Sequence, residues 1–401
     1  MITGAKPRLR MITPVWGTPY IDRWLCFGFA SQRSAGNIPF LAEHCDFELA
    51  IVTKSVDAAY MQSSSRFKEI MSGIRVRFIL MDEFFPRTGQ TSYGIPLTLA
   101  FAKGILDLGG SAIGTYVILM NADLVLATGS LKSILERIQE GYAIISAQSV
   151  RAMNDPIRSE LVKWTDRDSG VLSIEPRSLM RIISQNLHST ITARIINDPS
   201  IVDATYYHQI FWRVSDDCLA MRAFLVHPLC FRIEQIMEKV VCPVDYGFIT
   251  ELCPNGRFCV INDSDDYLAI ELQERDSESH LLRVTPRDRT LKRRLARLES
   301  EIAAHAQTWT IAEHRRSATQ TILYHEKDLS PDVAQRVAPF EAFVDRIVSR
   351  LPPPVSHVSH FQWLPAVRIY RQEMMRGGIA DSVTLLDDPR NDKPQQIVAA
   401  E

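Results

Sequence analysis

The side chains best placed for chemistry follow an apolar stretch in the first half of the chain. Residues 116–120 read YVILM, and Asn121, Ala122 and Asp123 come directly after them. Such a run predicts a strand buried on both faces, and ligands of open α/β sheets bind outside the carboxyl ends of the strands. Two polar side chains that flank one small residue point the same way from an extended chain. Asn121 and Asp123 can therefore hold a divalent cation that bridges two phosphates, with Asp123 as the metal ligand, or they can end the strand in an ordinary turn.

An aromatic ring and a glycine follow the first apolar stretch of the chain. The pattern predicts a strand over Arg10–Trp16, with Trp16 and Gly17 at its end. An aromatic face can stack on a base, and glycine allows the backbone to approach a ligand closely. Trp16 can equally pack at the edge of a core.

Two carboxylates and one histidine in the second half are candidates for proton transfer and metal binding. Asp245 lies in PVDYGF, where apolar neighbours favour a raised pKa, and Asp265 lies in INDSDDYL. Either can take a proton from an attacking hydroxyl group, although the second run also fits a solvated turn or a helix N-cap. His227 ends an apolar stretch, where it can ligate a metal, bond a phosphate or be purely structural.

Strands and helices alternate over residues 1–150. Strands separated by helices imply right-handed crossovers and a mainly parallel sheet flanked by helices, which is an α/β fold. The predicted strands are Arg10–Trp16, Phe47–Thr53, Ile74–Met81, Thr115–Met120 and Tyr142–Ala147. The predicted helices are Tyr20–Arg33, Val56–Met71, Tyr93–Leu108 and Ser130–Gln139.

The later residues continue this domain and then change in character. We predict helices at Asp155–Lys163, Pro176–Asn186 and Asp203–Arg213, and strands at Cys218–His227, Phe258–Ile261 and Tyr267–Leu272. The first domain is therefore expected over 1–275. A helical extension over 280–351 follows, with helices at Thr290–His305, Ala312–Tyr324 and Asp332–Leu351. Residues 352–401 are expected to be a proline-containing linker and a polar, disordered tail.

Composition argues against several classes of protein. The 401 residues carry a formal net charge of −2, so no global field attracts nucleic acid. No apolar run approaches the roughly 20 residues that span a bilayer, and we expect a cytoplasmic location. The seven cysteines are odd in number and none are spaced as C-x-x-C, which argues against a disulfide framework or a structural zinc site.

The densest positive charge of the chain lies in residues 283–297. This basic stripe fits the solvated face of a helix whose leucines pack on the main domain. It also fits peripheral contact with an anionic membrane surface. Its members are Arg283, Arg287, Arg289, Lys292, Arg293, Arg294 and Arg297.

Together these features resemble the glycosyltransferase A family of nucleotide-diphosphosugar transferases. The resemblance covers about residues 1–270 and rests on Ile12–Trp16, on the alternation of strands and helices, and on the Asn121-Ala122-Asp123 element. It implies that Asp123 holds a divalent metal ion, Mn or Mg, and the diphosphate. The first Asp of the family's D-x-D element is Asn121 here, which offers an oxygen without a charge. The resemblance also implies a nucleotide pocket lined by Thr13, Pro14, Val15 and Trp16.

The activity implied is transfer of a hexose from a nucleotide-diphosphate sugar to a glycan or similar acceptor. Residues 203–270 would supply the acceptor contacts and the base, for which Asp245 and Asp265 are the candidates. Signatures of other classes are missing: no G-x-G-x-x-G follows the first strand, and neither G-x-x-x-x-G-K-[ST] nor G-x-S-x-G occurs. The alternative is a non-catalytic module of the same fold that binds a sugar nucleotide or a protein partner, and Asn121 is its main support.

Overall fold

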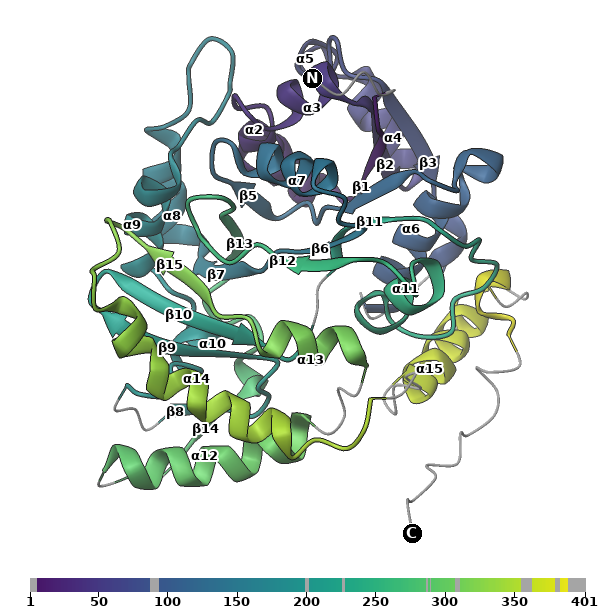
Figure 1. Cartoon of the computed structure of the whole chain (residues 1–401). Helices are drawn as coiled ribbons and strands as arrows, with labels where there is room; N and C mark the ends of the chain where they lie inside the picture. Colours follow the sequence, from purple (N-terminus) through teal and green to yellow (C-terminus); the bar gives the residue numbers. More distant parts are fainter. Residues whose placement is uncertain are drawn as a thin grey trace.

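A seven-stranded sheet organises the N-terminal part of the chain (Figure 1). The computed structural model describes residues 6–86, 94–198, 202–225, 228–285, 288, 290–306, 311–354, 363–378 and 383–388. The strands lie in the order β12-β6-β11-β4-β1-β2-β3. Their bounds are β1 Arg8–Pro14, β2 Asp46–Thr53, β3 Val76–Leu80, β4 Tyr116–Leu119, β6 Ile144–Ser146, β11 Pro228–Arg232 and β12 Phe258–Val260.

The sheet is mainly parallel, which confirms the predicted fold class. Only β11 runs antiparallel to its neighbours, between β4 and β6. The register of β1 and β4 pairs Ile12 with Leu119. The backbone N–H of Met120 then donates to the carbonyl oxygen of Ile12 across 2.9 Å. Because β1 and β4 are parallel, their carboxyl ends open side by side at one edge of the sheet.

Helices cover both faces of this sheet, and successive strand residues face different cores, as the period of two requires. Ile12 and Leu119 pack on one face with α6 (Gly94–Leu106), α11 (Val244–Leu252) and α15 (Trp363–Arg376). Met11 and Ile118 pack on the other face. The helices there are α3 (Ile38–His44), α4 (Ser55–Ser63), α5 (Ser65–Ile70), α7 (Ser130–Gln139), and a segment formed by α1 (Thr18–Arg23), the π-helical η1 (Trp24–Gly28) and α2 (Phe29–Gln32).

Three smaller sheets lie beyond the central one. The first has the order β5-β13-β7, the second β15-β10-β9, and the third pairs β14 with β8. Helices α8 (Asn154–Val162), α9 (Pro176–Ser184) and α10 (Ser189–Thr192) contribute to the core that the first two sheets share. The strand bounds are β5 Leu124–Leu126, β7 Ser149–Met153, β8 Val202–Ala204, β9 Gln209–Ser215, β10 Cys218–Ala223, β13 Ala269–Gln273, β14 Leu282–Val284 and β15 Ile322–His325.

The C-terminal helices pack on the sheet that contains β9 and β10 (Figure 1). They are α12 (Leu291–Ala306), α13 (Ala312–Ala318) and α14 (Val333–Ser349). Trp212 of β9 stacks on Phe340 of α14 with ring centroids 6.0 Å apart. Fully buried Asp203 of β8 pairs with Arg294 at 2.7 Å and with Arg297 at 2.8 Å, both on α12.

Several arginines of the basic stripe of residues 283–297 form ion pairs within the protein. Arg294 is buried, and Arg297 is occupied by carboxylates of the protein. Arg283 pairs with Glu301, while Arg287 and Arg289 lie outside the described residues. None of the described helices has both the length and the apolar character needed to cross a membrane.

One predicted helix is wrong. The segment expected as helix Asp203–Arg213 contains the end of β8 and most of β9. Its aromatic side chains pack on both faces of a strand, since Phe211 and Trp212 belong to different cores. Aromatic residues favour strands, and this preference outweighed the helical spacing.

Two predictions for the C-terminal part also need correction. The predicted helix Ala312–Tyr324 ends at Ala318, and β15 follows as an edge strand that pairs with β10. The range 352–401, expected to be a linker and a disordered tail, contains α15. Trp363 and Tyr370 of α15 are buried in the core that includes α6. Both segments therefore pack against the first domain.

Candidate functional site

The turn after β4 is positioned by close packing against the first helical segment. Asn121, Ala122 and Asp123 connect β4 to β5. A Cβ atom on Gly28 would lie 2.6 Å from the carbonyl oxygen of Ala122. Only glycine permits this approach of η1 to the turn, so Gly28 helps to fix the position of Asp123.

A second carboxylate, Glu271 of β13, lies close to Asp123. Gln273 Nε2 donates to Oε1 of Glu271 at 2.6 Å and lies 3.5 Å from Oδ2 of Asp123. The amide thus contacts both carboxylates. Burial, and next the negative charge of Glu271, raise the pKa of Asp123 to about 7, against the opposing charge of nearby arginines. Two carboxylates in this arrangement form a site where a cation is favoured.

Arg151 of β7 extends this row of charged side chains. The registers pair Leu124 of β5 with Glu271 of β13, and Glu271 with Arg151. Arg151 Nε donates to Oε2 of Glu271 at 3.0 Å, and its Nη1 donates to Glu278. Adjacent strands lie about 4.8 Å apart, so two strand spacings of about 10 Å separate Leu124 from Arg151.

A cavity of about 280 Å³ lies beside this row. Four residues of its wall are apolar: Leu97 and Phe101 of α6, Leu225, and Val244 at the start of α11. The other residues are polar or charged and come from the turn after β4, from β7, from β13 and from the segment that leads into β9. They are Asn121, Gln148, Ser149, Arg151, Tyr206, His208, Gln209 and Glu271. A pocket with one apolar side and one polar side suits a ligand that has both kinds of surface.

Asn121 offers an unused oxygen to this cavity. Its side chain lines the cavity, and its Oδ1 is buried without a hydrogen-bond partner among the described residues. Buried polar atoms without partners are uncommon, and an unseen ligand is one explanation. Mg²⁺ and Mn²⁺ prefer carboxylate and carbonyl oxygens. Asn121, Asp123 and Glu271 therefore offer the kinds of oxygen that such an ion takes as ligands.

The residues predicted to line the nucleotide pocket end β1 at the same edge of the sheet. Thr13, Pro14 and Val15 are buried, and Oγ1 of Thr13 has no hydrogen-bond partner among the described residues. Trp16 is half-buried. Gly17 has a φ of 82° and donates its N–H to Oδ2 of Asp57 at 2.9 Å. Trp16 and Gly17 thus have the accessible surface in this loop.

Trp16 contacts a side chain that follows β3, which in turn contacts one that follows β2. Its ring centroid lies 5.4 Å from that of Phe85, which follows β3, in an edge-on arrangement. Nζ of Lys54, which follows β2, lies 4.1 Å from the centroid of the Phe85 ring. Two aromatic rings and one ammonium group therefore meet at the carboxyl ends of β1, β2 and β3. Such a combination suits a flat ring next to a negative charge.

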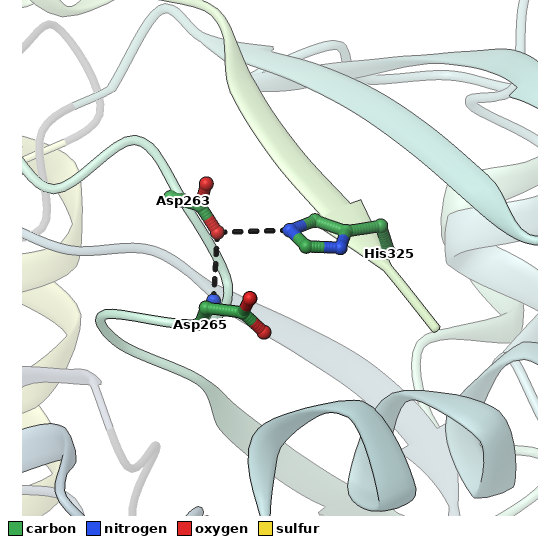
Figure 2. A group of neighbouring side chains, drawn as sticks. All are labelled: Asp263, Asp265 and His325. Carbon is green, nitrogen blue, oxygen red and sulfur yellow. Dashed lines mark hydrogen bonds and ion pairs between the residues drawn. The ribbon is translucent and has the colours of Figure 1, made fainter. Parts of the chain in front are cut away.

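Asp265, one of the two predicted bases, belongs to another cluster (Figure 2). Ligand atoms of Asp263, Asp265 and His325 all lie within 4.8 Å of one another. Oδ1 of Asp263 accepts from the backbone N–H of Asp265 at 2.8 Å and lies 2.9 Å from Nε2 of His325. This contact lowers the pKa of Asp263 and raises that of His325. Nδ1 of His325 in turn lies 2.7 Å from the carbonyl oxygen of Lys327.

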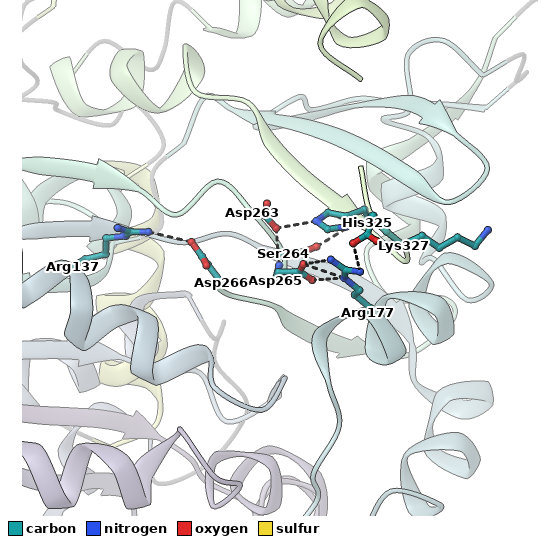
Figure 3. Close-up of polar contacts among 9 residues, drawn as sticks. Arg137, Arg177, Asp263, Ser264, Asp265, Asp266, His325 and Lys327 are labelled. Atoms are coloured by element: carbon teal, nitrogen blue, oxygen red, sulfur yellow. Dashed lines mark hydrogen bonds and ion pairs between the residues drawn. The ribbon is translucent and has the colours of Figure 1, made fainter. Parts of the chain in front are cut away.

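The remaining carboxylates of this run are also paired (Figure 3). Arg177 Nη2 donates to Oδ2 of Asp265 at 2.7 Å, and Arg137 Nη2 to Oδ2 of Asp266 at 3.1 Å. The run precedes β13, whereas Asp123 lies at the other end of that strand, where its carbonyl oxygen accepts from the N–H of Leu272 at 3.4 Å. The structure therefore places Asp265 in an ion-paired network and does not bring it together with Asp123.

Of two further predicted residues, the structure describes only the backbone of one. Asp245 lies in the first turn of α11, and its side chain is outside the description. The preceding residue, Val244, lines the cavity. His227 lies outside the described residues.

Glu271, Arg151 and His208 were not among the residues predicted from the sequence. All three line the cavity. The signal for Glu271 is a single acidic residue inside the apolar strand AIELQ. On such a strand a charged residue flanked by buried apolar ones marks the face that leaves the core. His208 carried no signal because its segment was interpreted as a helix.

No protein-family model and no curated protein sequence matches the chain. One similar solved structure is a mannosyltransferase from Pyrobaculum calidifontis in complex with GDP-mannose and Mn²⁺. It has 12% identity and a TM-score of 0.32, and the match covers 96% of this chain and 78% of that one.

Two further similar structures match only part of the chain. TarS from S. aureus has 15% identity and a TM-score of 0.23, with 37% of this chain covered and 24% of that one. Mouse xyloside xylosyltransferase 1 has 13% identity and a TM-score of 0.25, with 39% and 57% covered. The chain thus spans about a quarter of TarS and little more than half of the xylosyltransferase. Two of the three are glycosyltransferases by name, and likeness at these TM-scores carries no argument about this chain.

Proposed function

We propose that the protein is a glycosyltransferase that moves a hexose from a nucleotide-diphosphate sugar to a glycan or similar acceptor. The observation that carries this proposal is the meeting of two segments at one edge of the sheet. Thr13–Gly17 ends β1 and leads out of it, the Asn121-Ala122-Asp123 turn follows the adjacent β4, and Asn121 lines a cavity of about 280 Å³. Ligands of open α/β sheets bind at such an edge.

Metal assistance is supported by the oxygens near Asp123. Glu271 supplies a second carboxylate close to Asp123, and Asn121 contributes a buried oxygen that lacks a partner among the described residues. We assign the ion to Asp123, with Glu271 providing the charge that Asn121 lacks. A divalent ion bound there, Mn or Mg, would neutralise the charge that develops on the diphosphate leaving group.

The nucleotide is assigned to the aromatic end of the same edge. Trp16 and Phe85 offer ring surface to a base, and the ammonium group of Lys54 lies next to them. Glycine at position 17 lets the backbone approach the ribose or the phosphates. The diphosphate would then extend from this loop toward Asp123.

The acceptor is assigned to the cavity. In the transfer an acceptor hydroxyl oxygen bonds to the anomeric carbon, the bond from that carbon to the diphosphate breaks, and the hydroxyl proton passes to a base. Asp245 remains the candidate base because it directly follows Val244, which lines the cavity. Asp265 is ion-paired at the far end of β13 and is the weaker candidate.

The test is hydrolysis of UDP- and GDP-sugars with and without Mn²⁺. We expect slow metal-dependent turnover by the wild-type protein, and loss of both donor binding and turnover in Asp123→Ala. The matched control is Asp265→Ala, which removes a carboxylate outside the proposed metal site and should still bind the donor. Retention of full metal-dependent donor binding by Asp123→Ala would refute the assignment.

The same experiment separates the alternative, a non-catalytic module of the same fold. Asn121 in place of Asp is the observation that favours it. Such a module would bind a nucleotide sugar in calorimetry and show no hydrolysis with any donor or metal.

A further inference from the structure

A buried guanidinium group with two unpaired nitrogens contacts a residue of the cavity wall. Arg194 is fully buried, with 0% of its surface exposed. Its Nε donates to the carbonyl oxygen of Tyr206 at 3.0 Å. Neither Nη1 nor Nη2 has a hydrogen-bond partner among the described residues. A buried charged group that keeps two nitrogens unpaired is costly, and natural proteins retain few of them.

The groups around Arg194 make this cost larger. Burial, and next the positive charge of Arg151, lower the pKa of Arg194 to about 10. Burial and both guanidinium groups hold the pKa of His208 well below its usual value. Nδ1 of His208 is also buried without a partner among the described residues. Of the carboxylates around Arg194, Glu278 already receives a hydrogen bond from Arg151.

These groups lie at the polar wall of the cavity or, for Arg194, behind it. Tyr206, His208 and Arg151 line it, and Arg194 lies behind Tyr206, whose carbonyl oxygen it binds. An excess of buried positive charge is relieved by an anion, and guanidinium groups bind phosphate and carboxylate oxygens through paired N–H donors.

We propose that this wall of the cavity is a binding site for an anionic group, a phosphate or a carboxylate, held by Arg194 together with Arg151 and His208. Given the proposed function, on which this part rests, the anionic group belongs to the acceptor. The acceptor is therefore a phosphorylated or acidic sugar derivative.

Distance separates this site from the donor diphosphate. Arg151 is two strand spacings, about 10 Å, from Leu124, the neighbour of Asp123. Glu271 lies between them on the middle strand, where it pairs with Arg151. We therefore assign the anion at Arg194 to a different part of the substrates from the diphosphate at Asp123.

Calorimetry with simple anions tests the site. The probes are sodium phosphate against sodium chloride at equal ionic strength, and glucose 6-phosphate and glucuronate against glucose. We expect the wild-type protein to bind phosphate and at least one anionic sugar more tightly than glucose. Arg194→Gln should weaken this binding roughly tenfold or more, because it removes charge-assisted hydrogen bonds.

The controls use other arginines and a conservative change. Arg181→Gln removes an exposed guanidinium on α9 and should change phosphate binding less than about twofold. Arg194→Lys keeps the charge but not the fork of donors, so we expect intermediate affinity. Arg194→Lys also replaces Arg194→Gln as the test variant if Arg194→Gln does not fold. Wild-type affinity in Arg194→Gln, or in Arg194→Lys if that variant alone folds, would overturn the proposal, as would the absence of anion binding by the wild-type protein.

A second measurement distinguishes this inference from the proposed function. Asp123→Ala should lose Mn²⁺-dependent binding of UDP and GDP and keep phosphate binding at Arg194. Arg194→Gln should lose phosphate binding and keep Mn²⁺-dependent binding of UDP and GDP. If Asp123→Ala keeps nucleotide binding while Arg194→Gln loses phosphate, the transferase assignment fails and the anion site stands. If Arg194→Gln loses UDP and GDP as strongly as phosphate, the anion is the donor's diphosphate and the acceptor assignment is wrong.

Discussion

At the scale of single residues, the chemistry concentrates on Asp123 and its neighbours. The folded protein holds the pKa of Asp123 near 7 by burial and by the charge of Glu271. The carboxyl group of Asp123 thus loses its proton near pH 3.8 in the unfolded chain and only near pH 7 in the folded protein. The folded state binds more protons across this window, so the free energy of unfolding falls as pH rises through it. This loss in the free energy of unfolding is fully present above about pH 7 and absent below about pH 4.

We therefore predict that Asp123→Asn is more stable than the wild-type protein at pH 8 and nearly equal to it at pH 4. Each unit of pKa shift is worth about 1.4 kcal/mol, which limits the gain at pH 8 to about 4 kcal/mol. Thermal melts between pH 4 and 8 without metal measure it. Mn²⁺ should stabilise the wild-type protein above pH 7 and leave Asp123→Asn unchanged. A pH dependence shared by both proteins would contradict the assigned pKa.

Asn121 sets how much negative charge the site carries before a cation binds. In Asn121→Asp a third carboxylate joins Asp123 and Glu271, so like charges repel in the metal-free protein and attract a cation more strongly. We predict tighter Mn²⁺ binding, by roughly tenfold, together with a lower melting temperature without metal. Titration calorimetry and thermal melts measure the two effects.

Asn255→Asp provides the control for this change. It adds the same charge in an exposed turn and should alter neither quantity. Equal Mn²⁺ affinity in Asn121→Asp and the wild-type protein would place the ion elsewhere.

At the scale of elements, the sequence correctly predicts those helices and strands whose local residue pattern matches the way they pack in the folded protein. β2, β4 and α7 match the predicted ranges within a residue or two because a continuous apolar run or a helical stripe also faces a core. The helix predicted over Asp203–Arg213 is wrong. Its aromatic residues fit helical spacing by accident, whereas in the structure they alternate between two cores.

The residues of the candidate site also divide into those that a local sequence pattern reveals and those that it does not. Asp123 was found because a polar group after a buried strand is a local signal. Glu271, Arg151 and Arg194 reach the site only through strand pairing and chain crossings, namely β5-β13-β7 and the segment after α10. No local pattern encodes those long-range pairings, so the sequence marks Glu271 as an acidic residue in an apolar strand but does not place any of the three residues at the site.

The contact between η1 and the Asp123 turn can be tested at Gly28. In Gly28→Ala the new Cβ atom would meet the carbonyl oxygens of Ala122 and Leu124, at 2.6 and 3.2 Å. The turn must shift, so we predict a loss of about 1–3 kcal/mol in stability and weaker Mn²⁺ binding. Gly110→Ala is the matched control, since a Cβ atom there meets no atom within 4 Å. If Gly28→Ala kept wild-type affinity for Mn²⁺, the turn would not depend on this packing.

At the scale of the whole molecule, the C-terminal segments complete the fold around the site. β15 adds an edge strand to β10, α12 and α14 close the core over β9, and α15 packs on α6 behind the central sheet. Residues beyond 280 thus stabilise the same layers that carry Asn121 and Arg151. The domain boundary near 275 that we predicted from composition remains a proposal, and these contacts imply that the two parts unfold together.

The contact of α15 with the nucleotide end links this architecture to binding. The hydroxyl group of Tyr370 donates to the carbonyl oxygen of Phe84 at 2.8 Å in the buried core, and the next residue, Phe85, contacts Trp16. Tyr370→Phe leaves that carbonyl without its partner, which costs about 1–3 kcal/mol, and loosens the loop that holds Phe85. We predict a lower melting temperature and weaker binding of UDP or GDP, measured by thermal melts and calorimetry. Ile369→Ala, on the exposed face of the same helix, should leave both nearly unchanged. Weaker binding in Ile369→Ala as well would mean that the helix acts through its overall stability, whereas an effect confined to Tyr370→Phe would show that α15 supports the nucleotide pocket through Phe84.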